Sequence, residues 1–523
     1  MTKTWRGPSL DDWPGIGALT MGAFLDEVAD RFGAHEALVF DDPLRDNVTT
    51  RLSYADLLEA ASGVAKGLLQ RGITEGDRVA ILMGNRPEAV ASLFGACMAG
   101  GVAVPLSTFA TKQELTYMLQ SSAATTVLTQ TEMLGRRYVD DARELHDNVV
   151  AVGEGSWTEF LAAGEAVCDH DVDDKVFVTS PDDDALIIYS SGTTSTPKGM
   201  LHSHRAPTLQ FWLQSQLYKR TTDTRMWTAL PMFWTAGLNS AMGATLAAGG
   251  TWVMQESFDP GGALKLMARE RVTEPYTLPH QTGALEEHPD WSTTDLSSLK
   301  QVFGKSAFAR HPKVDGDPAW QSPVGYGLSE TCAFFVAHPA DAGRDLMKAS
   351  IGRLMPGNEL RVVDDELAIK GPTVMKHYIG KTPAECFDDD GFFHTGDAGF
   401  VDDDGNVHFT GRRTEMIKTG GANVSPAELE VELRACAPVK LARIVGVPDA
   451  RVDEMVVACI ILKDGATATE DDIRSFLKDR VASYKVPKRV LFFDDGDIPM
   501  TASDTKVRDE ELVALVTARL EHD

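Results

Sequence analysis

The stretch Tyr189-Ser-Ser-Gly-Thr-Thr-Ser-Thr-Pro-Lys198-Gly199 is the most informative segment of this sequence. It follows the apolar run 185–189 (ALIIY), which predicts a buried strand. Hydroxyls, loop N–H groups and a lysine are the groups that wrap phosphate oxygens. A Walker A loop ends on Gly-Lys-Ser/Thr, whereas here Lys198 precedes Gly199, so a Walker-type ATPase is disfavoured. The alternative, a flexible linker, does not need Pro-Lys-Gly behind an apolar strand.

Outward from this loop, apolar runs alternate with helical patterns. The runs that predict strands are 79–83, 102–106, 185–189 and 251–254. The segments that predict helices are 55–71, 112–121, 206–217 and 261–271. This alternation favours an α/β fold with layered, largely parallel sheets.

The texture changes after about residue 355. Short strands are expected at 359–363 and 366–370, then at 398–402 and 406–410 around Asp404-Gly405, as hairpins of a small β unit. From 413 a helix (426–435), two strands (441–447 and 455–462) and a second helix (469–480) predict a small α+β domain. We therefore predict a large N-terminal domain of layered α/β subdomains with a small β unit (1–412), followed by an α+β domain (413–523).

Composition limits the classes of function. A chain of 523 residues exceeds one compact core, and its net charge of −27 (50 − 77) repels nucleic acid and anionic membranes. Any site for a polyanion must then be locally positive or rich in N–H groups. The six cysteines are scattered without a CxxC pair, which indicates reduced, cytoplasmic thiols instead of disulfides or zinc.

Two segments bear on targeting. The N-terminal segment MTKTWRGPSLDDW lacks the apolar core of a secretory signal. The run 89–111 carries no charge, yet its glycines and Pro105 favour a soluble helix (88–99), a glycine turn and a buried strand (102–106) over a membrane span.

Four later segments are weak signals individually. Gly325-Tyr-Gly-Leu-Ser-Glu330-Thr331 offers an aromatic ring for a base and a carboxylate for Mg²⁺, but an ordinary turn fits equally well. The segment ending at Asp397 offers an acid for a ribose diol, or a plain Asx-turn. Arg412 lies at the change of texture, and Lys506 lies in a polar loop where a solvated lysine is the ordinary reading.

In this order, the five segments together resemble the adenylate-forming superfamily, which includes acyl-CoA synthetases, aryl-CoA ligases, luciferases and peptide-synthetase adenylation domains. The resemblance runs from Leu52 to the Lys506 loop. It implies ATP, Mg²⁺ and coenzyme A as cofactors, a small carboxylic acid as substrate, and a C-terminal domain that rotates between two half-reactions. Many members are dimers, so the resemblance allows a homodimer, which the sequence itself does not show.

The resemblance also implies roles for individual residues. The residues that match the phosphate cradle are Ser190, Ser191, Gly192, Thr193, Thr194 and Lys198. Those that match the adenine site are Gly304, Ser306, Ala307, Gly325, Tyr326 and Gly327, with an unusual lysine at 305. Glu330 matches the Mg²⁺ ligand, Thr331 an α-phosphate contact, Asp397 the ribose acid and Arg412 its partner at the domain junction. Lys506 matches the lysine that bridges the carboxylate and the α-phosphate.

These residue types suit the chemistry. A carboxylate must attack an anionic phosphate, so Lys506, Thr331 and Mg²⁺ on Glu330 would neutralise the developing charge. For the second half-reaction, the resemblance implies a thiol tunnel at Lys418, Gly420, Gly421 and Asn423, since paired glycines let a thin pantetheine arm pass close to the backbone. Locally, a simple glycine turn explains this segment as well.

The segment Leu230–Gly237 resembles the acid pocket of the superfamily. No Asp follows Phe233 to hold an α-amino group. The pocket residues implied are Phe233, Trp234, Ala236, Gly237, Ala333, Phe334 and Phe335. Such a lining favours an apolar acid, fatty, aromatic, alicyclic or steroid-derived. The alternative is that Trp234 belongs to the core.

The sequence departs from the superfamily at two points. The hinge position is Thr414 where Asp or Lys is usual, and the Lys506 loop is one residue longer than usual after Pro499. The predicted function is an AMP-forming acid–CoA ligase. Two alternatives stay open: an adenylation enzyme that loads a carrier-protein thiol, and a non-catalytic nucleotide-binding relative.

Overall fold

The computed structural model describes residues 3–190, 197–304, 306–412, 416–419, 422–449, 452–478, 480–481, 485–500 and 507–522. The chain divides into two compact units. The larger unit comprises Arg6–Glu359 with Lys370–Gly391, and the smaller comprises Met1–Trp5, Leu360–Ile369 and Phe392–Asp523. The domain boundary that we predict between residues 412 and 413 stays a prediction, as does rotation about it.

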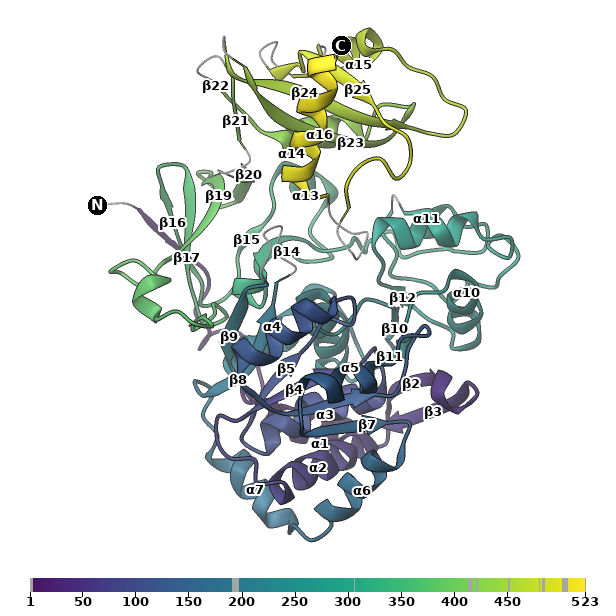
Figure 1. Ribbon diagram of the computed structural model, residues 1–523, viewed down its shortest axis with the longest axis vertical. Helices are drawn as coiled ribbons and strands as arrows, with labels where there is room; N and C mark the ends of the chain where they lie inside the picture. The colour runs from purple at the N-terminus through teal and green to yellow at the C-terminus, as the bar shows by residue number, and fades with distance from the viewer. Residues whose placement is uncertain are drawn as a thin grey trace. The chain divides into compact units, whose positions relative to one another are not determined.

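A seven-stranded sheet forms the centre of the larger unit (Figure 1). Its order is β18 (His377–Tyr378), β9 (Gly199–Ser203), β8 (Asp184–Tyr189), β5 (Val102–Pro105), β4 (Arg78–Leu82), β6 (Ala124–Gln130) and β7 (Val149–Val152). Strands from β8 to β7 run parallel, whereas β8–β9 and β9–β18 are antiparallel. The mainly apolar, buried residues of β4 and β5 fit a parallel sheet that is covered on both faces.

A second sheet of the larger unit has the order β12 (Glu274–Pro275), β10 (Arg225–Thr228), β11 (Thr251–Met254), β2 (Glu36–Asp42) and β3 (Val48–Ser53). A third, antiparallel sheet consists of β13 (Val324–Leu328), β14 (Ala333–His338) and β15 (Arg353–Leu354). The three strand pairs β10–β11, β10–β12 and β11–β2 are parallel, so the carboxyl ends of these strands lie at one edge of the sheet, together with the loops after β10 and β12.

Helices pack around these sheets. They are α1 (Met21–Phe32), α2 (Tyr54–Gln70), α3 (Pro87–Met98), α4 (Lys112–Ser122), α5 (Tyr138–Leu145), α6 (Gly155–Gly164), α7 (Asp169–Val178), α8 (Arg205–Leu217), α9 (Ala244–Ala247), α10 (Pro260–Arg269), α11 (Pro279–Glu287), α12 (Ala307–Arg310) and α13 (Arg344–Ala349). The Phe24 ring of α1 lies 6.1 Å from that of Phe94 in α3 and 5.0 Å from that of Phe211 in α8, so one aromatic cluster joins three helices.

The start of α2 shows how local sequence sets a helix boundary. The Ser53 hydroxyl accepts the Asp56 backbone N–H at 3.1 Å, and the Asp56 carboxylate accepts the Ser53 N–H at 2.9 Å. This capping box satisfies two donors that the first turn leaves free. The hydrogen bonds from Ser53 lower the pKa of the Asp56 carboxyl.

The smaller unit contains two sheets. Strands β1 (Thr4–Arg6), β16 (Glu359–Val363), β17 (Glu366–Lys370), β19 (Phe393–Val401) and β20 (Val407–Arg412) form one. Strands β22 (Ala422–Val424), β21 (Ile417–Thr419), β24 (Asp453–Leu462), β23 (Val439–Asp449) and β25 (Arg489–Phe492) form the other. Helices α14 (Pro426–Leu433), α15 (Glu470–Lys478) and α16 (Asp509–His522) complete this unit.

The mixed α/β fold confirms the fold class predicted from the sequence. The uncharged run 89–111 forms most of α3, a turn and β5, as expected. In the described part of the chain, no helix is long and apolar enough to cross a membrane.

Candidate functional site

The phosphate-loop segment connects two antiparallel strands. Strand β8 ends at Tyr189, β9 begins at Gly199, and these two residues are paired in register. The Ser190 N–H donates to the Lys198 carbonyl at 3.0 Å, which closes the ends of the loop. Four of the residues predicted to hold phosphate lie outside the described residues: Ser191, Gly192, Thr193 and Thr194.

Glu330 and Lys198 meet at a tyrosine that the sequence did not indicate. The Tyr378 hydroxyl donates to Glu330 Oε1 at 2.7 Å, and the Lys198 ammonium lies 5.8 Å from the centre of the Tyr378 ring. Because β18 pairs with β9, Tyr378 lies opposite Met200, close to the end of the phosphate loop. No described residue donates a hydrogen bond to Glu330 Oε2, so one carboxylate oxygen is oriented and the other is available to a cation.

Glu330 belongs to a constrained turn, Ser329–Ala333, that we call the acidic turn. Cys332 and Ala333 have φ angles of 58° and 143°, which are unusual for residues with a Cβ. The Thr331 side chain is fully buried, and its hydroxyl accepts the Leu328 N–H at 2.8 Å. In this structure Thr331 therefore stabilises the turn that presents Glu330, and its predicted contact with an α-phosphate stays a prediction.

Two buried amides hold the acidic turn from outside. The Gln210 side chain of α8 donates to the carbonyls of Thr331 and Phe334 at 3.1 and 2.6 Å. The Asn239 side chain, on the π-helix Ala236–Gly243 (η2), donates to the Cys332 carbonyl. Such external bonds can maintain a backbone conformation that costs energy by itself. Sequence patterns did not single out either amide.

The predicted adenine segment forms strand β13. The Tyr326 side chain is 9% exposed, which leaves little of the ring free for stacking. A Cβ on Gly327 would lie 1.7 Å from the Ala333 carbonyl oxygen, at a bulge between β13 and β14. Glycine at this position is therefore required by the close approach of two strands.

The predicted glycine-rich adenine wall borders a pocket. Ser306 and Ala307 line this pocket of about 550 Å³, whereas Gly304 does not, and residue 305 lies outside the described residues. The pocket is lined by aromatic and hydroxyl side chains, among them Tyr218, Tyr276, Thr282, Phe303, Phe308 and Trp320, and by the charged side chains of Glu274, Glu286 and Arg310. Such a lining suits a flat ligand that also carries polar groups.

Two of the predicted acid-pocket residues, Phe233 and Trp234, form an aromatic cluster with Phe109. The rings of Phe233 and Trp234 lie 5.7 Å apart, and both contact Phe109, at 5.5 and 5.8 Å. Phe109, which sequence reasoning missed, is 41% exposed, whereas Phe233 is 5% exposed. A Cβ on Gly237 would lie 2.0 Å from the Pro231 carbonyl oxygen, so this glycine allows a close backbone approach.

The other implied pocket residues are placed differently. Ala333 is part of the acidic turn, and Phe335 is fully buried. The segment 231–237 and the acidic turn are linked through Asn239, two residues after Gly237.

In the smaller unit, the predicted ribose acid and its partner are adjacent. Asp397 of β19 and Arg412 of β20 face each other in register, with 3.2 Å between Asp397 Oδ1 and Arg412 Nε. The Asp397 side chain is 2% exposed. The Thr395 hydroxyl accepts the Asp397 N–H at 3.0 Å and donates to the Leu367 carbonyl at 2.7 Å, which fixes the local backbone.

Two of the predicted thiol-tunnel residues, Lys418 and Asn423, belong to β21 and β22. Lys418 pairs in register with Asn423, and the Lys418 N–H donates to the Glu454 carboxylate at 2.7 Å. Gly420 and Gly421 lie outside the described residues, and so do Thr414 and Lys506.

Among the described residues, no group of three or more histidine, cysteine, aspartate or glutamate side chains could hold a metal ion. Mg²⁺ does not need such a cage, because it commonly binds one or two carboxylates together with substrate phosphates and water. The free oxygen of Glu330 fits that mode of binding.

Comparison with known proteins assigns the family. The profile of the AMP-binding enzyme family matches residues 25–379, and that of the AMP-binding enzyme C-terminal domain matches residues 428–505. The chain belongs to the AMP-binding enzyme family. These two matches, in this order, confirm the resemblance seen in the sequence, and the chain is an enzyme, an acid–thiol ligase of the acyl-CoA synthetase type.

Relatives of this AMP-binding enzyme include CoA ligases. A feruloyl-CoA synthase from Amycolatopsis sp is 32% identical over 88% of this chain and 93% of that protein. An indoleacetate–CoA ligase from Aromatoleum aromaticum is 31% identical over 90% of this chain and 94% of that protein.

Solved structures agree with the fold. ATP-bound MatB from Rhodopseudomonas palustris superposes with a TM-score of 0.77 at 28% identity, covering 95% of this chain and 99% of that one. The anthranilate CoA ligase AuaEII, in complex with anthranoyl-AMP, gives a TM-score of 0.79 at 23% identity, covering 98% and 99%, and supports the fold alone. ATP and coenzyme A are therefore substrates of this AMP-binding enzyme.

Proposed function

We propose that this enzyme activates an apolar carboxylic acid with ATP, forming an acyl-adenylate and pyrophosphate, and then transfers the acyl group to coenzyme A with release of AMP. The observation that carries the proposal is the Glu330 carboxylate, which accepts a hydrogen bond from Tyr378, with the ammonium of Lys198, at the end of the phosphate loop, over the ring of the same tyrosine. A carboxylate that could bind Mg²⁺ and an ammonium that could bind phosphate therefore lie at one tyrosine side chain, which supports the proposal.

In the proposed first half-reaction, a carboxylate oxygen of the substrate attacks the α-phosphorus of ATP, and the bond to the bridging oxygen of pyrophosphate breaks. Both reactants are anions, so fixed positive charge is needed at the phosphoryl oxygens. Lys198 and Lys506 would supply it. Mg²⁺ held by Glu330 would neutralise further charge on the phosphates. No nucleophile from the protein is required.

The smaller unit is proposed to bind the ribose and to complete the thiol step. The ion pair of Asp397 with Arg412 supports the ribose role, because it orients a nearly buried carboxylate whose oxygens could accept hydrogen bonds from a diol. We propose that residues 413–523 rotate between the half-reactions. Lys506 then serves adenylation, and the Lys418–Asn423 hairpin serves thiol transfer.

An apolar acid fits the residues near the site. The cluster of Phe109, Phe233 and Trp234 offers ring surfaces to the acid. The feruloyl and indoleacetate relatives act, by name, on acids that carry an aromatic ring. Together these support an aromatic or alicyclic acid over a short polar one.

The deciding experiment measures AMP release from ATP with a panel of fatty, aromatic, alicyclic and steroid-derived acids, with and without coenzyme A. We expect pyrophosphate release without coenzyme A, and acyl-CoA with it. Lys506→Ala should reduce acid-dependent pyrophosphate exchange by about 10²–10³. Exchange without acyl-CoA would instead support a carrier-protein acceptor. Absence of exchange in both the wild type and Lys506→Ala would support a non-catalytic nucleotide-binding protein.

A further inference from the structure

A second pocket, of about 570 Å³, lies at the opposite edge of the β12-β10-β11 sheet from the proposed acid site. Strand β10 begins at Arg225, which lines this pocket, and runs to Thr228, after which the chain enters the segment with Phe233 and Trp234. Strand β12 runs parallel to β10. The pocket therefore belongs to the amino ends of these strands and is separate from the proposed site at their carboxyl ends.

The lining is rich in cations. Its positively charged side chains are Arg225, Arg269, Arg271 and Lys300. Its remaining residues are Glu270, Thr273, Ser297 and Ser298. Four cations and one carboxylate are an unusual combination in a chain with a net charge of −27.

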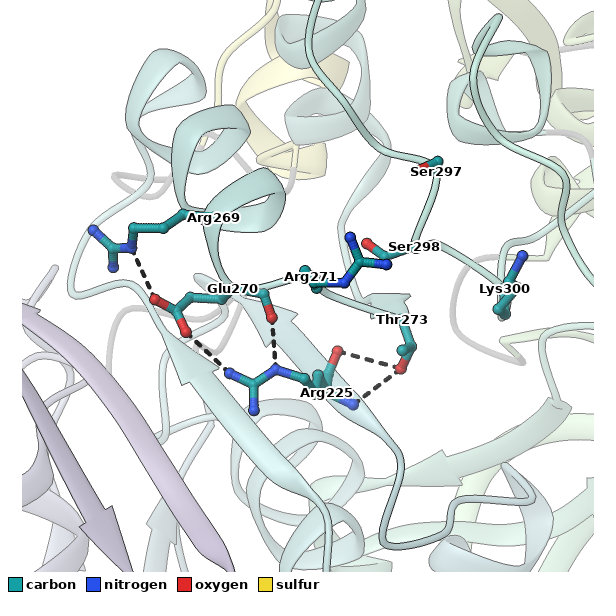
Figure 2. A pocket seen from close by; sticks show the side chains of 8 residues that line it. All are labelled: Arg225, Arg269, Glu270, Arg271, Thr273, Ser297, Ser298 and Lys300. Atoms are coloured by element: carbon teal, nitrogen blue, oxygen red, sulfur yellow. Dashed lines mark hydrogen bonds and ion pairs between the residues drawn. The ribbon is translucent and has the colours of Figure 1, made fainter.

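The single carboxylate of the lining, Glu270, is already paired with cations. Glu270 forms ion pairs with Arg225 at 3.0 Å, Arg269 at 2.8 Å and Arg51 at 2.7 Å. Burial raises the pKa of the Glu270 carboxyl, but hydrogen bonds from Arg51 and Arg269 outweigh burial and leave the pKa below its usual value. Arg225 also pairs with Glu36, at 2.8 Å. Figure 2 shows the Arg225 and Arg269 side chains turned toward Glu270, with which both form ion pairs.

The charges of Arg271 and Lys300 are not paired with a carboxylate in this way. Among the described residues, neither forms an ion pair within 4.0 Å. The Asp295 carboxylate accepts the Ser297 N–H at 3.1 Å, and its pKa is lowered mainly by hydrogen bonding to Ser297 and less by the charges of Lys313 and Arg271. In Figure 2 the Arg271 side chain extends away from Glu270.

The backbone segments that bear Arg271 and Lys300 are joined by hydrogen bonds. The Lys300 N–H donates to the Thr273 carbonyl at 2.9 Å, and the Ser298 hydroxyl donates to the Val272 carbonyl at 2.7 Å. These bonds tie the segment that bears Lys300 to the segment that bears Arg271. The two charges are therefore held across one pocket by a fixed frame.

Arg271 occupies a position where glycine is the ordinary residue. Helix α10 ends in a Schellman motif, in which the Val272 N–H donates to the Met267 carbonyl at 3.0 Å and the Arg271 N–H to the Ala268 carbonyl at 3.3 Å. Arg271 has a φ of 50°, a conformation that a side chain disfavours and glycine adopts freely. A side chain at this position therefore costs stability that glycine would not.

We propose that this pocket binds a small molecule bearing a phosphate group, with Arg271 and Lys300 as its charge contacts. A guanidinium and an ammonium are the cations that proteins use for phosphate oxygens. The volume exceeds that of inorganic phosphate and falls in the range of sites for small organic ligands. The site goes beyond the proposed ligase activity and does not depend on it.

The test is residue-resolved lysine labelling of the full chain. Amine acylation is followed at Lys300 and at Lys265, an exposed lysine of α10 that does not line the pocket, by mass spectrometry of peptides. The probes are orthophosphate, pyrophosphate, coenzyme A and 3′-dephospho-coenzyme A, with sodium chloride at matched ionic strength as the control. At ten times its Kd, a bound probe should slow labelling of Lys300 about tenfold and leave Lys265 unchanged.

The variant Arg271→Gly keeps the fold testable, because glycine suits the left-handed conformation. It should raise the urea midpoint of unfolding while weakening protection of Lys300 about tenfold or more. The matched control Lys265→Gln removes one charge from the same helix and should leave protection unchanged. Protection by coenzyme A that its dephospho form lacks would identify an organic phosphomonoester, and protection by the inorganic anions would identify a free phosphate.

Two results would overturn the proposal. One is that no probe slows labelling of Lys300 more than that of Lys265. The other is that Arg271→Gly leaves the protection curve where it is in the wild type.

Discussion

The hydrogen bond from Tyr378 to Glu330 gives the sharpest test of the site. Tyr378→Phe removes the hydroxyl and keeps the ring, and with it the contacts to Lys198 and Lys381 at 5.8 and 5.7 Å from the ring centre. A hydrogen bond to a charged group is worth about 1.5–3 kcal/mol. Because Glu330 is only half-buried, water replaces part of that bond, and we expect a loss of about 1 kcal/mol in orienting the carboxylate.

That loss should weaken the use of Mg²⁺-bound ATP and leave the stability of the fold unchanged. We expect Tyr378→Phe to lower kcat/KM for ATP about fivefold to tenfold, with a matching rise in the Mg²⁺ concentration needed for half-maximal pyrophosphate exchange. Tyr378→Leu also removes the ring beside Lys198 and should lower kcat/KM further. Tyr117→Phe, at an exposed tyrosine of α4, is the matched control and should leave the rate unchanged.

The assay is acid-dependent pyrophosphate exchange across a Mg²⁺ titration, together with a thermal unfolding curve for each variant. The reasoning would be refuted if Tyr378→Phe kept the wild-type Mg²⁺ dependence. It would also be refuted if Tyr378→Phe lost activity only in proportion to a fall in Tm, since the bond would then serve the fold alone.

Three further predictions concern the frame around the site. Gln210→Leu removes the side-chain donor to the carbonyls of Thr331, in the acidic turn, and of Phe334, just after it. This should lower the free energy of unfolding by about 2 kcal/mol, measured in urea, whereas an unchanged value would mean that the turn is stable without these bonds. Gly327→Ala places a Cβ 1.7 Å from a carbonyl oxygen and should lower the free energy of unfolding by about 3 kcal/mol or more. The control Gly283→Ala, whose Cβ would meet no atom within 4 Å, should leave that free energy unchanged or raise it. Equal effects of the two variants would contradict the close approach at the β13–β14 bulge. Burial lowers the pKa of His202 and of His204 to about 4, so the unfolded chain binds more protons between pH 4 and 6.5, and stability should fall across that window as pH falls, by on the order of 2–3 kcal/mol per ring. Urea midpoints against pH should show a shallower slope for His202→Leu, and an unchanged slope would contradict the assignment.

The sequence by itself determined the local elements and the family. Short apolar runs became strands β4, β5, β8 and β11, because side-chain burial follows directly from such runs. The uncharged run 89–111 became a helix, a turn and a strand, because its glycines and proline interrupt it. The order of five short motifs was enough for the AMP-binding family, since each motif keeps its chemistry in adjacent residues.

Only the tertiary structure decided which side chains serve those motifs. Tyr378 reaches Glu330 across 48 positions of sequence, and Gln210 reaches the acidic turn across 121. These contacts depend on the pairing of β18 with β9 and on the packing of α8, which no local pattern encodes. The same reason applies to the phosphate pocket that we propose. In the sequence, Arg271 and Lys300 look like ordinary surface charges. In the structure, hydrogen bonds hold their two segments together at one pocket, where Glu270 is already paired with other arginines.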